Sequence, residues 1–285
     1  MCVSVKRPVL RYHGGKWRLA PWIISHFPPH RVYVEPYAGA ASVLLQKPRC
    51  YAEVYNDRWE VVVNVFRVLR DPEQARELER VLRLTPFSRR EFDQCGDMHL
   101  AQVEDPIERA RRTLLRSFAG FGSAATNATY STGFRGLNNR AHTTPAHDWM
   151  RYPDYVVSFV ERLRGVVIEN RNALDVIRYY DRHDGVLFYV DPPYPHSTRN
   201  MERGNAAYAE EMIDDDHRAL AGVLRECTGM VVLSGYACDL YDNELYPDWR
   251  RVEKPVFADG ARAKTEVLWM SPDTPETQAT LFTSG

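Results

Sequence analysis

The segment GVLFYVDPPYPHS, residues 185–197, carries the strongest structural signal in the chain. Residues 185–190 are mostly apolar and strand-favouring, which predicts a buried β-strand. Asp191 follows the strand directly, and Pro192 and Pro193 then fix the backbone φ near about −65° and remove two N–H donors. A rigidly held acid at the carboxyl end of a buried strand predicts a functional site, because parallel sheets bind ligands at that edge.

Strand and helix patterns alternate on both sides of this segment. Before it, the pattern predicts strands at residues 31–34 and 50–57, a helix beginning near Ala41 or Ser42, and a further helix over residues 58–72. The alternation resumes with strands at 165–170 and 230–236, helices at 173–181 and 214–229, and a terminal hairpin at 252–272. The order predicts an α/β sheet built from residues 1–57 and 153–285, with a second domain inserted at residues 58–152.

Composition excludes several classes of protein. The chain has 285 residues, 44% of them hydrophobic and 26% charged, as expected for a globular protein with a sizeable core. The sequence has no apolar run near the ~18 residues of a membrane span and no secretory signal pattern. The five cysteines are scattered without a C-x-x-C pair, which argues against a disulfide framework and a metal site and predicts a cytoplasmic protein.

Basic residues are concentrated in two parts of the chain. The net charge is only −1, but residues 1–34 and residues 109–147 each contain six lysines or arginines and no acid. Segregated positive charge of this kind is typical of a surface that meets a polyanion. Residues 119–151 are also rich in Gly, Ser, Thr, Asn and Ala and lack a sustained period, which predicts a loop-rich surface segment.

The turn after the first predicted strand has the composition of a cofactor-binding loop. Glu35 to Gly39 and the alanines that follow are mostly small, so a ligand can approach the backbone closely. Asp57 ends the next strand about twenty residues later, where an acid typically accepts hydrogen bonds from ribose hydroxyls. The turn lacks the full G-x-G-x-x-G pattern of a pyrophosphate site, so a nucleoside without phosphates is favoured, and S-adenosyl-L-methionine fits. An ordinary strand–helix turn is the alternative.

Asp191 and Pro192 are suited to methylation of an exocyclic amine. The lone pair of adenine N6 is delocalised into the ring, and the nitrogen becomes a better nucleophile when both N–H groups donate to acceptors. The Asp191 carboxylate can accept one hydrogen bond and the backbone carbonyl of Pro192 the other. Tyr194 adds a flat ring on which an extruded base can stack. Catalysis is then mainly a matter of positioning the nitrogen in line with the methyl donor.

Four motifs together resemble the Dam-like (D12 class) DNA adenine-N6 methyltransferases of the phage and prophage type. RYHGGKWRL (11–19) is similar to the family's N-terminal cofactor motif, EPYAGAASV (35–43) to its main cofactor loop, YND (55–57) to its ribose-binding acid and DPPY (191–194) to its catalytic motif. TEVLWMSP (265–272) resembles the family's last strand. The chain departs from the family at Ala41, where glycine is usual, and at Asn172-Ala173, where an acid and an aromatic residue are usual.

The resemblance implies a Rossmann-like S-adenosylmethionine-dependent methyltransferase sheet with an inserted, mostly helical and loop-rich DNA-recognition domain. Catalytic roles are expected for Asp191, Pro192, Pro193 and Tyr194. Cofactor contacts are expected from Tyr12, Lys16, Glu35, Tyr37, Gly39, Asp57, Asn172 and Asp191. DNA contacts are expected from Arg116, Asn127, Tyr130, Arg135, Asn138, Asn139, Arg140 and Arg199, whose side chains suit bases and phosphates.

The predicted reaction is site-specific methyl transfer to adenine N6 in double-stranded DNA, with base flipping, as in restriction-modification. One alternative is methylation of cytosine N4 or of an RNA amine, although the cytosine version of the motif more often begins with Ser than with Asp191. A second alternative is a catalytically silent DNA-binding protein on the same scaffold, against which the intact Asp57 and Asp191 count. Whether two copies bind a palindromic site as a homodimer is also left open.

Overall fold

The computed structural model of the chain describes residues 5–96, 100–121, 132–137, 143–198, 211–257 and 263–275. Within these residues one sheet is formed by β1 (Val32–Glu35), β2 (Ala52–Asn56), β3 (Val166–Glu169), β4 (Val186–Val190), β5 (Met230–Tyr236), β6 (Arg250–Phe257) and β7 (Ala263–Met270). Strands β1 to β5 are parallel, whereas β7 is antiparallel to β5 and β6 is antiparallel to β7. The predicted α/β sheet and the predicted terminal hairpin are therefore confirmed.

The strand order β3-β2-β1-β4-β5-β7-β6 reverses between β1 and β4. The chain runs outward from β1 through β2 to β3, and then returns to the other side of β1 to form β4. The parallel register pairs Val32 with Val186 and Val34 with Phe188. The turn after β1 and the DPPY segment after β4 therefore leave the same edge of the sheet as neighbours. Open α/β sheets bind their ligands at such a point.

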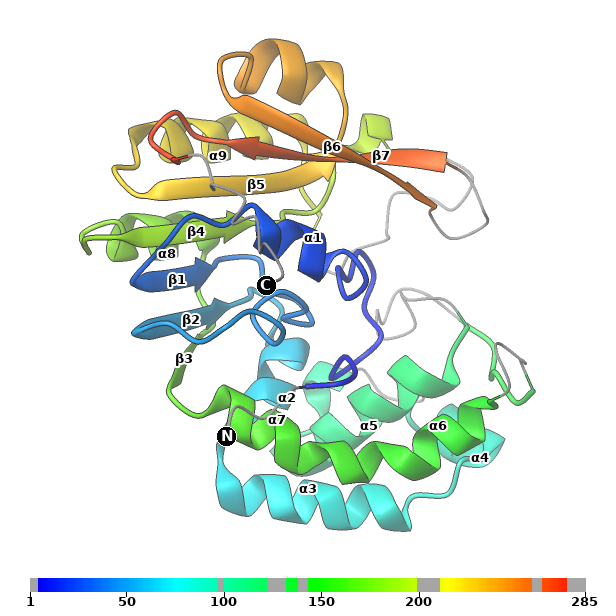
Figure 1. Cartoon of the computed structure of the whole chain (residues 1–285). Helices are drawn as coiled ribbons and strands as arrows, with labels where there is room; N and C mark the ends of the chain where they lie inside the picture. Colours follow the sequence, from blue (N-terminus) through cyan, green and yellow to red (C-terminus); the bar gives the residue numbers. More distant parts are fainter. Residues whose placement is uncertain are drawn as a thin grey trace, which may run out of the picture.

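Successive residues of the central strands pack on opposite faces of the sheet, because side chains alternate along a strand. Val34 belongs to the apolar core on one face, which is closed by α8 (Ala173–Tyr180) and α9 (Asp214–Glu226). Tyr33 belongs to the core on the other face, where α1 (Ala20–Ser25) contributes. Helices therefore cover both faces of the sheet, as Figure 1 shows.

The chain between β2 and β3 is mostly helical in its described parts. The helices are α2 (Glu60–Arg70), α3 (Pro72–Leu84), α4 (Arg89–Gln94), α5 (Pro106–Ala119), α6 (Pro145–Arg151) and α7 (Val156–Leu163). Helices α3 and α5 begin in the same way. Asp71 and Asp105 accept hydrogen bonds from backbone N–H groups at the N-termini of these helices, and a proline occupies the first helical position of each. No helix among the described residues has the length and apolar character needed to cross a bilayer.

These helices share an apolar core with one face of the sheet. In Figure 1 they gather below the sheet, with α2 nearest to the strands. Phe66 of α2 packs against Tyr55 of β2 with ring centroids 4.4 Å apart. Arg7 ties the start of the chain to the same helices, since its guanidinium lies about 5 Å from the rings of Phe118 and Tyr152.

The prediction that a helix begins near Ala41 or Ser42 is wrong. Residues 39–46 form hydrogen-bonded turns instead. Gly39 has φ +49° and Ala41 has φ +53°, whereas an α-helix needs φ near about −63° at every residue. The left-handed conformation costs an L-residue such as Ala41 roughly 1–2 kcal/mol, and glycine adopts it without that cost. The run of small residues in this segment is therefore the sequence feature that indicates a turn.

Candidate active site

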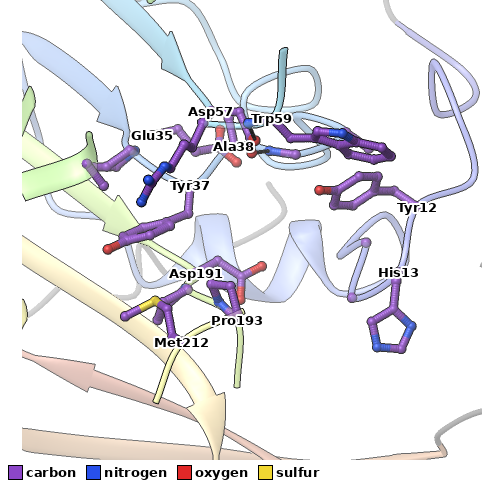
Figure 2. Close-up of a pocket in the computed structure, with 18 of the residues that line it drawn as sticks. Tyr12, His13, Glu35, Tyr37, Ala38, Asp57, Trp59, Asp191, Pro193 and Met212 are labelled. Carbon is purple, nitrogen blue, oxygen red and sulfur yellow. Dashed lines mark hydrogen bonds between the residues drawn. The ribbon is translucent and has the colours of Figure 1, made fainter. Parts of the chain in front are cut away.

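A pocket opens at the carboxyl ends of β1, β2 and β4, where the strand order reverses. Its empty volume is about 1200 Å³, a figure that includes open solvent at the mouth. All eight residues expected from the sequence to contact a cofactor line this pocket. Figure 2 shows Tyr12, Tyr37, Asp57 and Asp191 around the cavity. The sequence therefore predicted which residues come together, although their contacts with a ligand stay a prediction.

Asp191 is held through one of its two carboxylate oxygens. Oδ1 accepts a hydrogen bond from Ser234 Oγ at 2.9 Å and lies 3.0 Å from Lys16 Nζ. Ser234 Oγ is itself hydrogen-bonded to the hydroxyl of Tyr189 at 3.0 Å, and this bond helps to hold the serine side chain in place. Oδ2 accepts no hydrogen bond within the described residues. The strand end thus presents one oriented acceptor at the wall of the pocket.

Pro192 and Pro193 also line the pocket, directly after Asp191. Neither has a backbone N–H, so this wall lacks two donors that a strand end would otherwise offer. No hydrogen bond engages the Pro192 carbonyl in the part of the chain that the structure describes. Two acceptors, a carboxylate oxygen and a carbonyl oxygen, therefore stand one residue apart.

Lys16 lies in a cluster of charged groups beside Asp191 and is only 5% exposed. Its ammonium donates to the Gly14 carbonyl at 3.0 Å, pairs with Asp191, and lies 3.7 Å from Glu266 Oε1. It also lies 4.6 Å from the centre of the Tyr194 ring. Glu266, on β7, is 2% exposed, and its burial raises the pKa of its carboxyl while the Lys16 ammonium lowers it.

Tyr194 is turned into the protein rather than toward the pocket. It is 5% exposed, and its hydroxyl donates to Glu266 Oε1 at 2.6 Å. The ring packs edge-on against Tyr236 with centroids 4.7 Å apart, and Lys16 lies over it. A base can stack on this ring only after the ring becomes exposed, so the stacking role expected from the sequence stays a prediction.

Asp57 organises the turn after β1. Its Oδ2 accepts the Gly39 N–H and its Oδ1 accepts the Trp59 N–H, both at 2.8 Å. A carboxylate has about four lone-pair directions, so these bonds leave capacity for the hydroxyls of a ribose. The backbone N–H groups of Gly39 and Trp59 therefore hold Asp57 in place, in the loop where a nucleoside would bind.

Tyr12 and Trp59 form an aromatic corner of the pocket, which Figure 2 shows. Their ring centroids are 6.2 Å apart. Tyr12 also lies tightly against Gly39: a Cβ added to that glycine would be 2.6 Å from Tyr12 Cε1. Gly39 is thus required twice, by its left-handed φ and by the ring beside it.

Glu35 is a buried acid at the end of β1. Its Oε2 accepts hydrogen bonds from the Tyr33 hydroxyl and the Leu44 N–H, both at 3.1 Å. Burial raises its pKa to about 8, and these two hydrogen bonds only partly oppose that effect. Between about pH 4.5 and pH 8 the folded chain holds a proton on Glu35 that the unfolded chain releases, so the stability that this proton contributes is lost as the pH rises through that window.

Asn172 lines the pocket as the N-cap of α8. Its Oδ1 accepts the Leu174 N–H at 2.9 Å, so the side-chain oxygen is used by the helix. The amide nitrogen of Asn172 is the group that remains to donate to a ligand. A hydrogen bond to an adenine amino group would instead need the side-chain oxygen.

The residues expected to contact DNA are only partly described. Arg116 lies on α5 and is 9% exposed, with its guanidinium 5.5 Å from the Phe92 ring, and burial lowers its pKa. Arg135 donates to the Phe118 carbonyl at 2.8 Å. Contact of Arg116 with DNA would require its side chain to leave this position. Asn127, Tyr130, Asn138, Asn139, Arg140 and Arg199 lie outside the described residues.

Several pocket and neighbouring residues were missed in the sequence. Trp59 and Met212 line the pocket, and Ser234 and Glu266 hold the Asp191 cluster. Glu266 did carry a signal, since it is an acid in the otherwise apolar strand TEVLWM. Ser234 did not, because only the pairing of β4 with β5 brings it to Asp191. Within the described residues no group of three or more His, Cys, Asp or Glu side chains could hold a metal ion.

The comparisons with known proteins identify the family. The chain matches the D12 class N6 adenine-specific DNA methyltransferase family over residues 12–253, which is most of its length. No curated protein matches the chain. The protein therefore belongs to the D12 class of methyltransferases that modify adenine N6 in DNA, and the pocket between β1 and β4 is its candidate active site.

Proposed function

We propose that this adenine-N6 DNA methyltransferase uses S-adenosyl-L-methionine as its methyl donor and acts at a specific site in double-stranded DNA, on an adenine flipped out of the helix. The observation that supports it best is the geometry of Asp191. One oxygen is held by Lys16 and Ser234, and the other accepts no hydrogen bond among the described residues at the pocket wall. Base flipping follows from the same geometry, because an amine inside a duplex cannot reach an acceptor set at a strand end.

The chain's own residues act by orienting the target amine. Asp191 Oδ2 accepts one N6–H and the Pro192 carbonyl accepts the other, which draws the nitrogen lone pair out of conjugation with the ring. S-adenosylmethionine supplies an electrophilic methyl group when it is bound. The proline pair keeps competing N–H donors away from the amine, so the nitrogen meets acceptors only. The N6 proton that becomes acidic on methylation can leave to solvent, so a strong base is not required.

The residues around the pocket fit a nucleoside that carries an amino acid. Asp57 suits the ribose hydroxyls, and Tyr12 with Tyr37 provides flat apolar surface. Gly39 lets a ligand approach the backbone of the turn, where any Cβ would strike Tyr12. We extend the same assignment to Lys16, Glu35, Asn172 and Asp191, which complete the set predicted from the sequence.

The helical part of the chain is proposed to recognise DNA. Residues 58–152 are taken as the target-recognition insert, between the catalytic parts 1–57 and 153–285. This assignment rests on the basic, acid-free segment 109–147 within it. Among the described residues, Arg135 is the one that we propose to contact DNA. Arg140 and Arg199, which lie outside the described residues, are proposed to contact DNA as well. Action as a homodimer on palindromic sites, a phage or prophage origin and a place in restriction-modification stay predictions.

Methylation-sensitive long-read sequencing of DNA from a host that expresses the protein tests the function. Wild-type protein should leave N6-methyladenine in one sequence context. Asp191→Asn replaces an acceptor oxygen by a donor amide and should leave none, at an equal level of folded protein. Methylcytosine at N4 would contradict the adenine assignment. Binding of S-adenosylmethionine without transfer to any DNA would favour the silent DNA-binding alternative.

A further inference from the structure

The residues around Asp191 include an acid from β7, which is separated from β4 by β5. Glu266 lies on β7, opposite Tyr236 of β5 in the antiparallel pair. Its Oε1 accepts the Tyr194 hydroxyl at 2.6 Å and lies 3.7 Å from Lys16 Nζ. One oxygen thus contacts both the last residue of the DPPY motif and the lysine that pairs with Asp191.

The position of the Lys16 ammonium is fixed from four directions. The Gly14 carbonyl and Asp191 Oδ1 each lie at 3.0 Å, Glu266 Oε1 at 3.7 Å, and the Tyr194 ring at 4.6 Å. Both carboxylates attract the same ammonium, and in a buried site such attraction is stronger than in water. Glu266 therefore adds a second attraction that helps to hold the Lys16 ammonium where it pairs with Oδ1 of Asp191.

We propose that Glu266 is a positioning residue for methyl transfer, which holds Lys16 on Oδ1 of Asp191 and fixes Tyr194, so that Oδ2 stays open to the target amine. The inference rests on the proposed function, in which Oδ2 accepts one N6–H. Without the Glu266 charge, Lys16 loses one of the two carboxylates that attract its ammonium. The ammonium then moves between the two oxygens of Asp191 and competes with the amine for Oδ2.

The test separates positioning from folding with three variants. Glu266→Gln keeps the size of the side chain but removes the charge, and with it the ion pair with Lys16 and the charge-assisted hydrogen bond from the Tyr194 hydroxyl. Tyr194→Phe removes only the hydroxyl end of the same contact. Glu53→Gln is the matched control, because Glu53 is 3% exposed and is also paired with a lysine, Lys47 at 2.8 Å. Its ion pairs are with Lys47 and Arg162 rather than with Lys16.

Steady-state methylation of DNA gives kcat and the KM for S-adenosylmethionine, at a temperature where thermal melts show every variant folded. Glu266→Gln should lower kcat at least tenfold and change KM less than threefold. Glu53→Gln should lower the melting temperature and leave kcat within twofold of wild type. In the double variant of Glu266 and Tyr194, kcat should fall no further than in Glu266→Gln alone, since both changes break one contact.

Three results would overturn the inference. A kcat of Glu266→Gln within threefold of wild type shows that Glu266 is not required to position Lys16. Equal loss of kcat in Glu53→Gln shows that any buried acid matters and that Glu266 is merely structural. Losses that multiply in the double variant show that Tyr194 and Glu266 act separately. An inactive wild-type protein contradicts the proposed function instead, so the two failures are distinguishable.

Discussion

Gly39→Ala should damage both the fold and the pocket, because the glycine meets two requirements at once. Its φ of +49° lies in the left-handed region, and an added Cβ would be 2.6 Å from Tyr12 Cε1 and 3.0 Å from Tyr12 Cδ1. Ordinary van der Waals contact begins near 3.4 Å, so the Tyr12 ring must move away by about 0.8 Å. Tyr12 is at the same time a wall of the cofactor pocket.

The magnitude follows from these two terms. The left-handed conformation costs alanine about 1–2 kcal/mol, of which roughly 0.5–1 kcal/mol is returned because alanine restricts the unfolded chain. Overpacking against the Tyr12 ring adds about 1–3 kcal/mol, depending on how easily the ring shifts. We expect the free energy of unfolding to fall by about 1–4 kcal/mol. Displacement of Tyr12 should weaken S-adenosylmethionine binding at least tenfold, which is about 1.4 kcal/mol.

Urea unfolding measures the first effect and isothermal titration with S-adenosylmethionine measures the second. Ala41→Gly is the matched control in the same turn, since it relieves a left-handed alanine with φ +53°. It should leave binding unchanged and alter stability by only about 0–1 kcal/mol, in the stabilising direction. If Gly39→Ala keeps both wild-type stability and wild-type affinity, the close approach of Tyr12 to the turn is not a feature of the folded protein.

Two further predictions concern pH and DNA. Since burial raises the pKa of Glu35 to about 8, Glu35→Gln should flatten the loss of stability between about pH 4.5 and pH 8; urea unfolding at pH 5 and pH 8 measures this, and an unchanged slope would contradict it. At least one of Arg116, Arg135 and Arg140 should read a guanine edge, so one alanine variant should lose roughly 1–3 kcal/mol of discrimination at a single base position. Methylation rates on single-base site variants test it, and unchanged preference in all three variants would place recognition elsewhere.

The sheet could be predicted because its signals are local. Each strand is a short apolar run bounded by polar or turn residues, and GVLFYV before Asp191 is the clearest of them. The turn after β1 could not be predicted in the same way, since Ala41 has good helix propensity and yet adopts φ +53°. The Asp57 bond to the Gly39 N–H helps to hold that conformation, and it depends on the pairing of β1 with β2.

The pocket residues could be predicted because short sequence motifs contain them, most of these motifs at strand ends. Their mutual contacts could not, because these depend on strand order. Lys16 and Asp191 were each recognised, but nothing local shows that they are 3.0 Å apart. Tyr194 was expected beside a substrate base and is instead buried against Glu266, an arrangement that requires β7 to lie beside β5.

The place of Glu266 in the chain has a consequence for how the enzyme is made. Lys16 precedes the first strand, Asp191 follows the fourth, and Glu266 lies in β7, the last strand among the described residues. A nascent chain on the ribosome can bring Lys16 to Asp191 while the acid that steadies the lysine is still untranslated. Domains form as their segments emerge, N-terminal parts first. Full methylation competence should therefore appear only after the β6–β7 hairpin has left the exit tunnel and docked on β5.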